Sequence, residues 1–115
     1  MASPPEEFAI SADDRDGRVH LTLQGELDLA TAPEFEQLIN ERVDEGREVV
    51  VDLRRLEFMD SSGIRVLVAA HARAGRTGAK VHIVRPEAGS AVAKIVEVSG
   101  LDTELNIVDD PAHVA

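Results

Sequence analysis

The sequence contains no cysteine, tryptophan or tyrosine, and only three phenylalanines among its 115 residues. Without cysteine, disulfide bonds, thiol catalysis and cysteine metal sites are all excluded. Aromatic residues make up 3% and hydrophobic residues 43% of the chain, so a folded core has to be aliphatic. No stretch has the length and hydropathy of a membrane span, and the first residues lack a signal-peptide hydrophobic region. We therefore expect a cytoplasmic protein that makes no membrane contact.

Positive charge is also scarce. The chain has 12 Lys and Arg against 22 Asp and Glu, a formal net charge of −10. A protein that binds nucleic acid normally presents a basic face to the phosphates, so we expect no direct DNA or RNA binding. The histidines show no metal-binding spacing, and no phosphate-binding loop is present. We expect no metal and no cofactor, and surface or interface positions for His20, His71, His82 and His113.

The length predicts a single domain. Residues 1–7 are expected to form a flexible N-terminal tail and residues 8–115 the folded domain. The strands expected at Phe8–Ile10 and Val19–Leu23 would pair as an antiparallel hairpin at a sheet edge, with residues 13–17 as the turn. Helices and strands then alternate. This order predicts an α/β fold, with a mixed central sheet of about four or five strands packed with about four helices.

The expected later elements follow from periodicity and from capping residues. Thr31 and Glu34 have the spacing of a capping box at the start of a helix. The helix expected before residue 100 is predicted to open at Pro86. The remaining expected elements are a buried strand over 49–53, a helix over 64–74, a buried strand over 81–84 and an edge strand over 105–108.

The segment Asp60-Ser61-Ser62-Gly63 lies between the expected buried strand over 49–53 and the helix that begins near Ile64. Unpaired N–H groups at a helix start favour negative charge. A small hydroxyl residue there has two interpretations. It caps the helix, as Asp and Ser commonly do, or it presents a hydroxyl that receives a phosphoryl group. Spacing alone favours capping and leaves the second interpretation open.

Three stretches together resemble the STAS-domain anti-sigma-factor antagonists: Phe58–Ile64, Gly25–Asp28 and Val98–Leu101. The resemblance runs from about Phe8 to the end of the chain. It implies the STAS fold and phosphorylation of Ser61, the hydroxyl residue directly after the aspartate. It also implies a binding cycle. The unphosphorylated protein would bind an anti-sigma factor, itself a serine kinase, and so free a sigma factor. Phosphorylation of Ser61 would end that binding, and a serine phosphatase would restore it.

The residues expected to surround the phosphorylation site and contact the partner are Asp28, Asp60, Ser62, Gly63 and Arg65. The two aspartates would orient the hydroxyl and then repel its phosphate, although each also suits a capping role. Gly63 is expected to permit close approach by backbone or partner. Arg65 is the nearest cation in the sequence, with either pairing to the phosphate or simple exposure as its role.

Two other functions are compatible with parts of this sequence. A serine hydrolase would need glycine two residues before its nucleophile, and Met59 occupies that position before Ser61. No histidine carries a supporting motif for a general base either. The chain is therefore expected to be a binding module and not an enzyme. The alternative within the same family is a STAS interaction or scaffold subunit of a larger signalling or sensory assembly.

Overall fold

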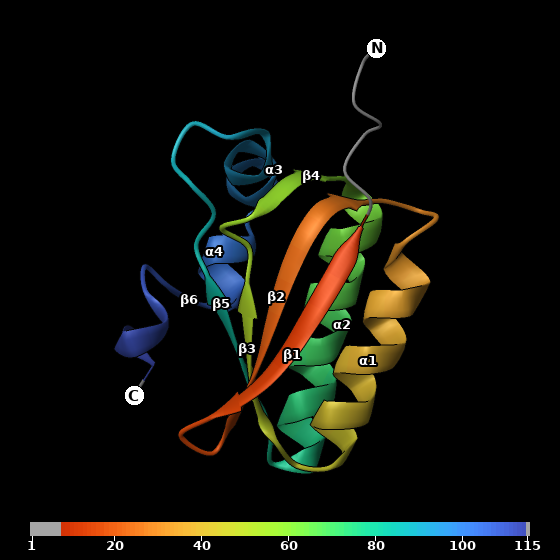
Figure 1. Ribbon diagram of the computed structural model, residues 1–115, viewed down its shortest axis with the longest axis vertical. Helices are drawn as coiled ribbons and strands as arrows, with labels where there is room; N and C mark the ends of the chain where they lie inside the picture. The colour runs from red at the N-terminus through yellow and green to blue at the C-terminus, as the bar shows by residue number, and fades with distance from the viewer. Residues whose placement is uncertain (1–7, 115) are drawn as a thin grey trace.

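The first two strands form an antiparallel hairpin, as expected, and begin a longer run of alternating elements (Figure 1). The computed structural model describes residues 8–114, so the predicted tail over 1–7 lies outside the described residues. The strands are β1 (Ala9–Arg15), β2 (Arg18–Leu27), β3 (Glu48–Asp52), β4 (Leu56–Met59), β5 (Lys80–Val84) and β6 (Asn106–Val108). The helices are α1 (Ala32–Asp44), α2 (Ser61–Thr77), α3 (Ala91–Ser99), α4 (Leu101–Glu104) and the 3₁₀ turn η1 (Pro111–His113).

The sheet is mixed, with the strand order β1-β2-β3-β5-β6. β1 is antiparallel to β2, whereas β2, β3, β5 and β6 pair in parallel. β4 lies off this path and pairs in parallel with the end of β2, after a register shift between Gly25 and Glu26. β2 has ten residues, and on the side away from β1 its first half pairs with β3 and its second half with β4.

The predicted α/β class and mixed sheet are confirmed, but the element counts differ from the prediction. Six strands are present in residues 8–114, against the four or five expected. Three helices there have nine or more residues, and α4 is a single turn of four. None of the helices in this part of the chain has the length and apolar character needed to cross a membrane.

The core is aliphatic except for Phe35, as the composition requires. Helices α1 and α2 lie side by side on one face of the sheet (Figure 1). Alternation along β2 turns Val19, Leu21 and Leu23 toward this core, and all three are fully buried. Burying a side chain of this kind contributes about 1.5–3 kcal/mol, and most of the buried hydrophobic residues belong to this core.

Several local predictions were wrong in detail. β1 continues to Arg15, because Asp16 and Gly17, both with positive φ, suffice to turn the chain. α3 begins after its N-cap Ser90, whose hydroxyl accepts from Ala93 N at 3.1 Å, so Pro86 lies in the preceding loop. Thr31 makes no capping-box bond, because its hydroxyl is engaged with Asp28 and Glu26 in the loop before α1.

The opposite face of the sheet is partly covered by the end of the chain. Val114 packs there with Val50 and Val84. His20 and His82 lie on either side of Val50 in the strand register and are only 7% and 8% exposed. These histidines were predicted at surface or interface positions, and a surface position is wrong for these two. A distant segment packs on the face that alternation alone assigns to solvent.

Two carboxylates on this second face are held by arginines. Glu48 Oε2 accepts from Arg18 Nε at 2.6 Å and lies 3.0 Å from His82 Nε2. Asp52 accepts from Arg54 Nε at 3.0 Å and from a terminal Arg54 nitrogen at 2.8 Å. Burial works to raise the pKa of each carboxyl, but hydrogen bonds and charge from these partners outweigh it and lower both pKa values.

These lowered pKa values predict how stability depends on pH. The unfolded carboxyls bind protons near their ordinary pKa values of 4.5 and 3.8, whereas the folded ones bind them only at lower pH. The stabilisation is therefore present above about pH 4.5 and is lost as the pH falls through the folded pKa values. Urea unfolding between pH 7 and pH 3 should show this loss. Asp52→Asn should reduce the slope of the free energy of unfolding against pH. A slope equal to that of the wild type would contradict the assignment.

Candidate functional site

Ser61 is the first residue of α2 and is exposed. The element that precedes it is β4 rather than β3, a correction to the prediction that the buried strand over 49–53 leads directly into the helix. Because β4 runs parallel to the end of β2, the carboxyl ends of both strands meet at one edge of the sheet. Asp60 N donates to Leu27 O at 3.2 Å, which fixes the start of α2 against β2.

Asp60 is the N-cap of α2. Its Oδ1 atom accepts from Ser62 N at 2.8 Å, and its carbonyl oxygen accepts from Gly63 N at 3.1 Å. The capping interpretation of this segment is therefore correct for Asp60. It does not compete with the second interpretation, because the cap is made by the carboxylate and the Ser61 hydroxyl is not required for it.

Asp28 reaches the same edge of the sheet and organises the loop between β2 and α1. Its Oδ1 atom accepts from Ala30 N at 3.0 Å and from Thr31 N at 3.1 Å. Asp28 N in turn donates to the Thr31 hydroxyl at 2.9 Å. Thr31 was not among the predicted site residues; the Asp-x-x-Thr spacing of a side-chain-stabilised turn is the signal that identifies it. The two predicted aspartates thus lie at the ends of neighbouring strands.

Gly63 lies in the first turn of α2 and is buried. A Cβ atom here would come within 2.7 Å of both Leu27 Cδ2 and Met59 Cγ, closer than side-chain carbons pack. The expected close approach is therefore present, but the groups that approach are core side chains of β2 and β4. Glycine lets the first turn of α2 lie directly on the strand ends, and this contact sets the position of Ser61.

Ser62 and Arg65 border a small hollow between the starts of α1 and α2. The hollow has a volume of about 200 Å³, and its wall on the α1 side includes Leu29 and Pro33. Arg65 is exposed. The predicted site residues Asp28, Asp60, Ser62, Gly63 and Arg65 are thus brought to one end of the molecule with Ser61.

Exposed apolar side chains at this end were missed by the sequence analysis. Leu29 and Val98 are each 79% exposed, and Phe58 is 41% exposed. Leu29 follows β2, Phe58 lies on β4, and Val98 lies on α3, which packs against β4 (Figure 1). The one available signal was an isolated leucine in the polar loop that begins with Asp28. Apolar side chains left in water around a polar centre are typical of a protein-binding surface.

Among the side chains that the structure describes, no group of three or more His, Asp or Glu is arranged to hold a metal ion. The site consists of the exposed Ser61 hydroxyl at a helix N-terminus, the Asp60 cap, the loop that Asp28 orders, and exposed apolar side chains nearby. This combination is typical of a protein-binding surface and differs from the concave, mostly apolar pockets that hold small substrates.

The Asp60 cap can be tested separately from any function. Asp60→Ala removes the acceptor for Ser62 N and should lower the free energy of unfolding by about 1 kcal/mol, because N-cap replacements cost about 0.5–2 kcal/mol. Asp60→Asn keeps an oxygen acceptor and should cost less. Chemical denaturation of the three proteins makes the comparison, and equal stability would show that the observed bond does not stabilise α2.

Residues 10–109 match a family model described as Mlab, STAS domain. The match spans most of the sequence, and the chain belongs to the STAS domain family. It is 33% identical over 101 residues to the anti-sigma-F factor antagonist RsfB of Mycobacterium tuberculosis (strain ATCC 25618 / H37Rv), covering 87% of this chain and 80% of RsfB. It is 35% identical over 94 residues to the putative anti-sigma factor antagonist BtrV of Bordetella bronchiseptica, covering 79% of this chain and 78% of BtrV.

Solved structures show the same fold. An anti-sigma factor antagonist from Mycobacterium paratuberculosis superposes with a TM-score of 0.80 and 29% identity, over 96% of this chain and 93% of that one. The unphosphorylated form of the anti-sigma factor antagonist SpoIIAA superposes with a TM-score of 0.70 and 18% identity, over 92% and 91% of the two chains. Its phosphorylated form, from Bacillus, gives 0.66 and 21% identity, over 87% and 91%.

Proposed function

We propose that this protein is an anti-sigma-factor antagonist that acts in the cytoplasm as a binding module and not as an enzyme. Similarity over most of the chain to proteins named for this role supports the proposal. The single observation that carries it is the exposed Ser61 on a helix start that Asp60 caps and Gly63 holds against the sheet. In its unmodified form the protein binds an anti-sigma factor and so releases a sigma factor.

The partner is a serine kinase that uses this surface as its substrate. The γ-phosphoryl group of ATP is transferred to Ser61 Oγ: the bond to the ADP oxygen breaks, the Oγ–P bond forms, and the hydroxyl proton is released. A phosphatase later hydrolyses the Oγ–P bond with water and restores the serine. Asp28 and Asp60 lie at the ends of the two strands beside this hydroxyl, where they shape the loop and the helix start that the kinase approaches.

The modification acts at the interface rather than on the fold. Phosphate adds about −1.5 to −2 charges. A helix N-terminus stabilises such a group by about 0.3–1 kcal/mol, up to about 2 when it is partly buried. A carboxylate about 5 Å away opposes it by about 3 kcal/mol per unit charge pair at an effective dielectric constant of about 20, before screening by salt. These opposing effects are of similar size, so the fold persists while the partner meets a dianion among apolar side chains.

Site mapping tests the acceptor directly. Incubation with the cognate anti-sigma kinase and ATP should add one phosphate, and peptide mass spectrometry should place it on Ser61. Ser61→Ala should abolish the modification, whereas Ser62→Ala should retain it, because Ser62 N is engaged in the cap and its side chain borders the hollow beside Arg65. Phosphate on Ser62, with Ser61→Ala still modified, would overturn the assignment.

Purification from native cells separates this function from that of a scaffold subunit. The unmodified protein should co-purify with an anti-sigma kinase in a complex of two kinds of chain. Isolation in a large assembly that lacks such a kinase would favour the scaffold function instead.

A further inference from the structure

An open hollow lies on the sheet face opposite α1 and α2, between the β1–β2 hairpin and the C-terminal segment. It has a volume of about 360 Å³, within the range of small-molecule sites. Arg15, Arg18 and His20 line it from the hairpin, Arg54 from the loop after β3, and Asp110 and Ala112 from the chain end. The function proposed above makes no use of this hollow. Three arginines around one cavity are notable in a chain with only 12 basic residues.

Each of the three guanidinium groups is already oriented by a carboxylate. Arg15 Nε lies 2.9 Å from Asp13 Oδ2, and Arg18 Nε lies 2.6 Å from Glu48 Oε2. Arg54 is held by Asp52, which is itself only 7% exposed. A guanidinium carries five donor hydrogens. Contact through Nε in Arg15 and Arg18, and through Nε and one terminal nitrogen in Arg54, therefore leaves further donors on each group. The carboxylates therefore fix the direction of these groups without using all of their donors.

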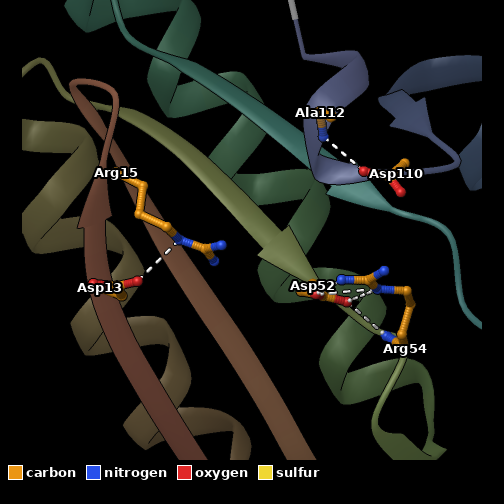
Figure 2. Close-up of polar contacts among 6 residues, drawn as sticks. All are labelled: Asp13, Arg15, Asp52, Arg54, Asp110 and Ala112. Atoms are coloured by element: carbon orange, nitrogen blue, oxygen red, sulfur yellow. Dashed lines mark hydrogen bonds and ion pairs between the residues drawn. The ribbon is translucent and has the colours of Figure 1, made fainter.

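The arginines come from different elements but reach the same region. Figure 2 shows the Arg15 side chain extending from β1 toward the part of the structure that holds Asp52 and Arg54. Asp110, on the C-terminal segment, lines the same hollow. The charge of Arg15 also contributes to lowering the pKa of Asp52, so the two groups are within electrostatic range. Burial, and after it the charges of Arg15 and Arg18, lower the pKa of His20. Burial is the main cause of this lowering; among the charges that act on the His20 pKa, Arg15 contributes most, and Asp13 and Asp16 oppose the arginines.

The acidic groups of the wall limit which anions fit. Asp16 and Asp110 line the hollow, and Asp110 Oδ1 accepts from Ala112 N at 2.8 Å. The hollow is therefore no general basic patch, and a long polyanion such as nucleic acid would be repelled by these residues and by the chain's net charge of −10. A compact group that accepts several hydrogen bonds is favoured instead. Guanidinium forks match phosphate oxygens in geometry and charge.

A second hollow adjoins the first and shares Arg54 with it. Its volume is about 380 Å³, and its wall includes Arg85, Pro86 and Asp109. Arg85 Nε lies 3.0 Å from Asp109 Oδ1, so this arginine too is oriented by a carboxylate. The second hollow provides space for the remainder of a molecule whose charged group lies among Arg15, Arg18 and Arg54.

We propose that these arginines bind the phosphate group of a small phosphorylated molecule, at a site on the sheet face opposite Ser61. The ligand would join three separate parts of the chain: the β1–β2 hairpin, the loop after β3 and the C-terminal segment. Free inorganic phosphate and a phosphate ester share the chemistry that the arginines recognise, and the second hollow favours the ester. This site is separate from the anti-sigma surface, because its lining includes neither Ser61 nor any of the residues placed around Ser61 above.

Titration of the whole protein followed by NMR tests the proposal. The probes are inorganic phosphate and glycerol 3-phosphate, with glycerol as the uncharged control, all at constant ionic strength. We expect saturable shifts of the amides of Arg15, Arg54 and Ala112, tighter binding of the ester, and a rise in the pKa of His20 when the anion is bound. Tighter binding of inorganic phosphate would retain the anion site but overturn the role of the second hollow. Shifts that do not saturate, or that glycerol reproduces, would overturn the proposal.

Substitutions separate a specific site from general charge attraction. Arg15→Gln alters an exposed ion pair and should weaken phosphate binding at least tenfold without affecting folding. Arg54→Lys keeps the charge beside buried Asp52 but removes the fork, and it should also weaken binding. Arg73→Gln is the matched control, because Arg73 forms an exposed ion pair with Asp44 on the helix side. Equal weakening by Arg73→Gln, or unchanged binding in both other variants, would overturn the assignment.

Discussion

Replacing Ser61 by aspartate is expected to weaken binding to the anti-sigma factor by about 2–4 kcal/mol, roughly 30- to 700-fold. The change places one negative charge at the exposed start of α2, at the same end of the molecule as the apolar residues Leu29 and Phe58. A charge that loses water in a packed interface without gaining a partner costs several kcal/mol, and central contacts carry most of the binding energy. Aspartate supplies one charge where phosphate supplies nearly two, so true phosphorylation should weaken binding further. Calorimetric titration against the purified anti-sigma factor measures the affinity of the Ser61→Asp variant and of the phosphorylated protein.

Ser61→Ala is the matched control. It removes the acceptor and adds no charge, so it should bind the anti-sigma factor as tightly as the wild type and resist inactivation by ATP. Both variants should keep the wild-type circular dichroism and melt within a few degrees of it, because the cap belongs to Asp60. If Ser61→Asp bound normally, charge at this position would not be the switch. If it lost binding only by unfolding, the modification would act through stability instead.

Two glycines of α2 are expected to respond in opposite directions to the same substitution. An added Cβ at Gly63 would lie 2.7 Å from Leu27 Cδ2 and from Met59 Cγ, whereas at Gly75 it would meet nothing within 4 Å. Gly63→Ala should therefore lower the free energy of unfolding by about 1–3 kcal/mol through overpacking. Gly75→Ala should raise it by about 0.5–1 kcal/mol, since alanine is the better helix former.

Thermal and urea unfolding of both variants measure this difference, which should separate their melting temperatures by at least roughly 5 °C. Gly63→Ala should also weaken anti-sigma binding, because the first turn of α2 has to move away from the strand ends and carries Ser61 with it. Binding measured well below the melting temperature keeps the two effects apart. Equal stability of the two variants would show that the core tolerates a methyl group at Gly63.

The site was more predictable from sequence than the strands that position it. Asp60-Ser61-Ser62-Gly63 is a contiguous motif, and the cap made by Asp60 and the exposure of Ser61 follow from its position at a helix start. The close contact of Gly63 with Leu27 of β2 depends instead on tertiary packing. The preceding strand β4 was missed because its central residues Glu57 and Phe58 are both exposed. That pattern shows neither the alternation of a half-buried strand nor the apolar run of a buried one. β4 exists because β2 extends beyond β3 and offers it a parallel partner, which is a tertiary effect.

The buried histidines were unpredictable for a related reason. His20 alternates with core residues of β2, so its position indicates a solvent-facing side chain. Its burial depends on the β1–β2 turn and on residues near the end of the chain, some 90 positions away, which enclose the same hollow. Likewise the pairing of His82 with Glu48 joins residues 34 positions apart. Contacts of this separation leave no periodic signal in one sequence.

The last strand has a consequence for how the molecule opens. β6 joins the sheet through only three residue pairs with β5, and a single helical turn precedes it. By contrast, β2 is bonded along its length to β1, β3 and β4. In native-state hydrogen exchange, the amides of 105–114 should therefore exchange through local opening well before those of 19–27, which await global unfolding. Asp110 and Ala112 form one wall of the arginine-lined hollow. Local opening of 105–114 would therefore remove that wall while Ser61 stays in place.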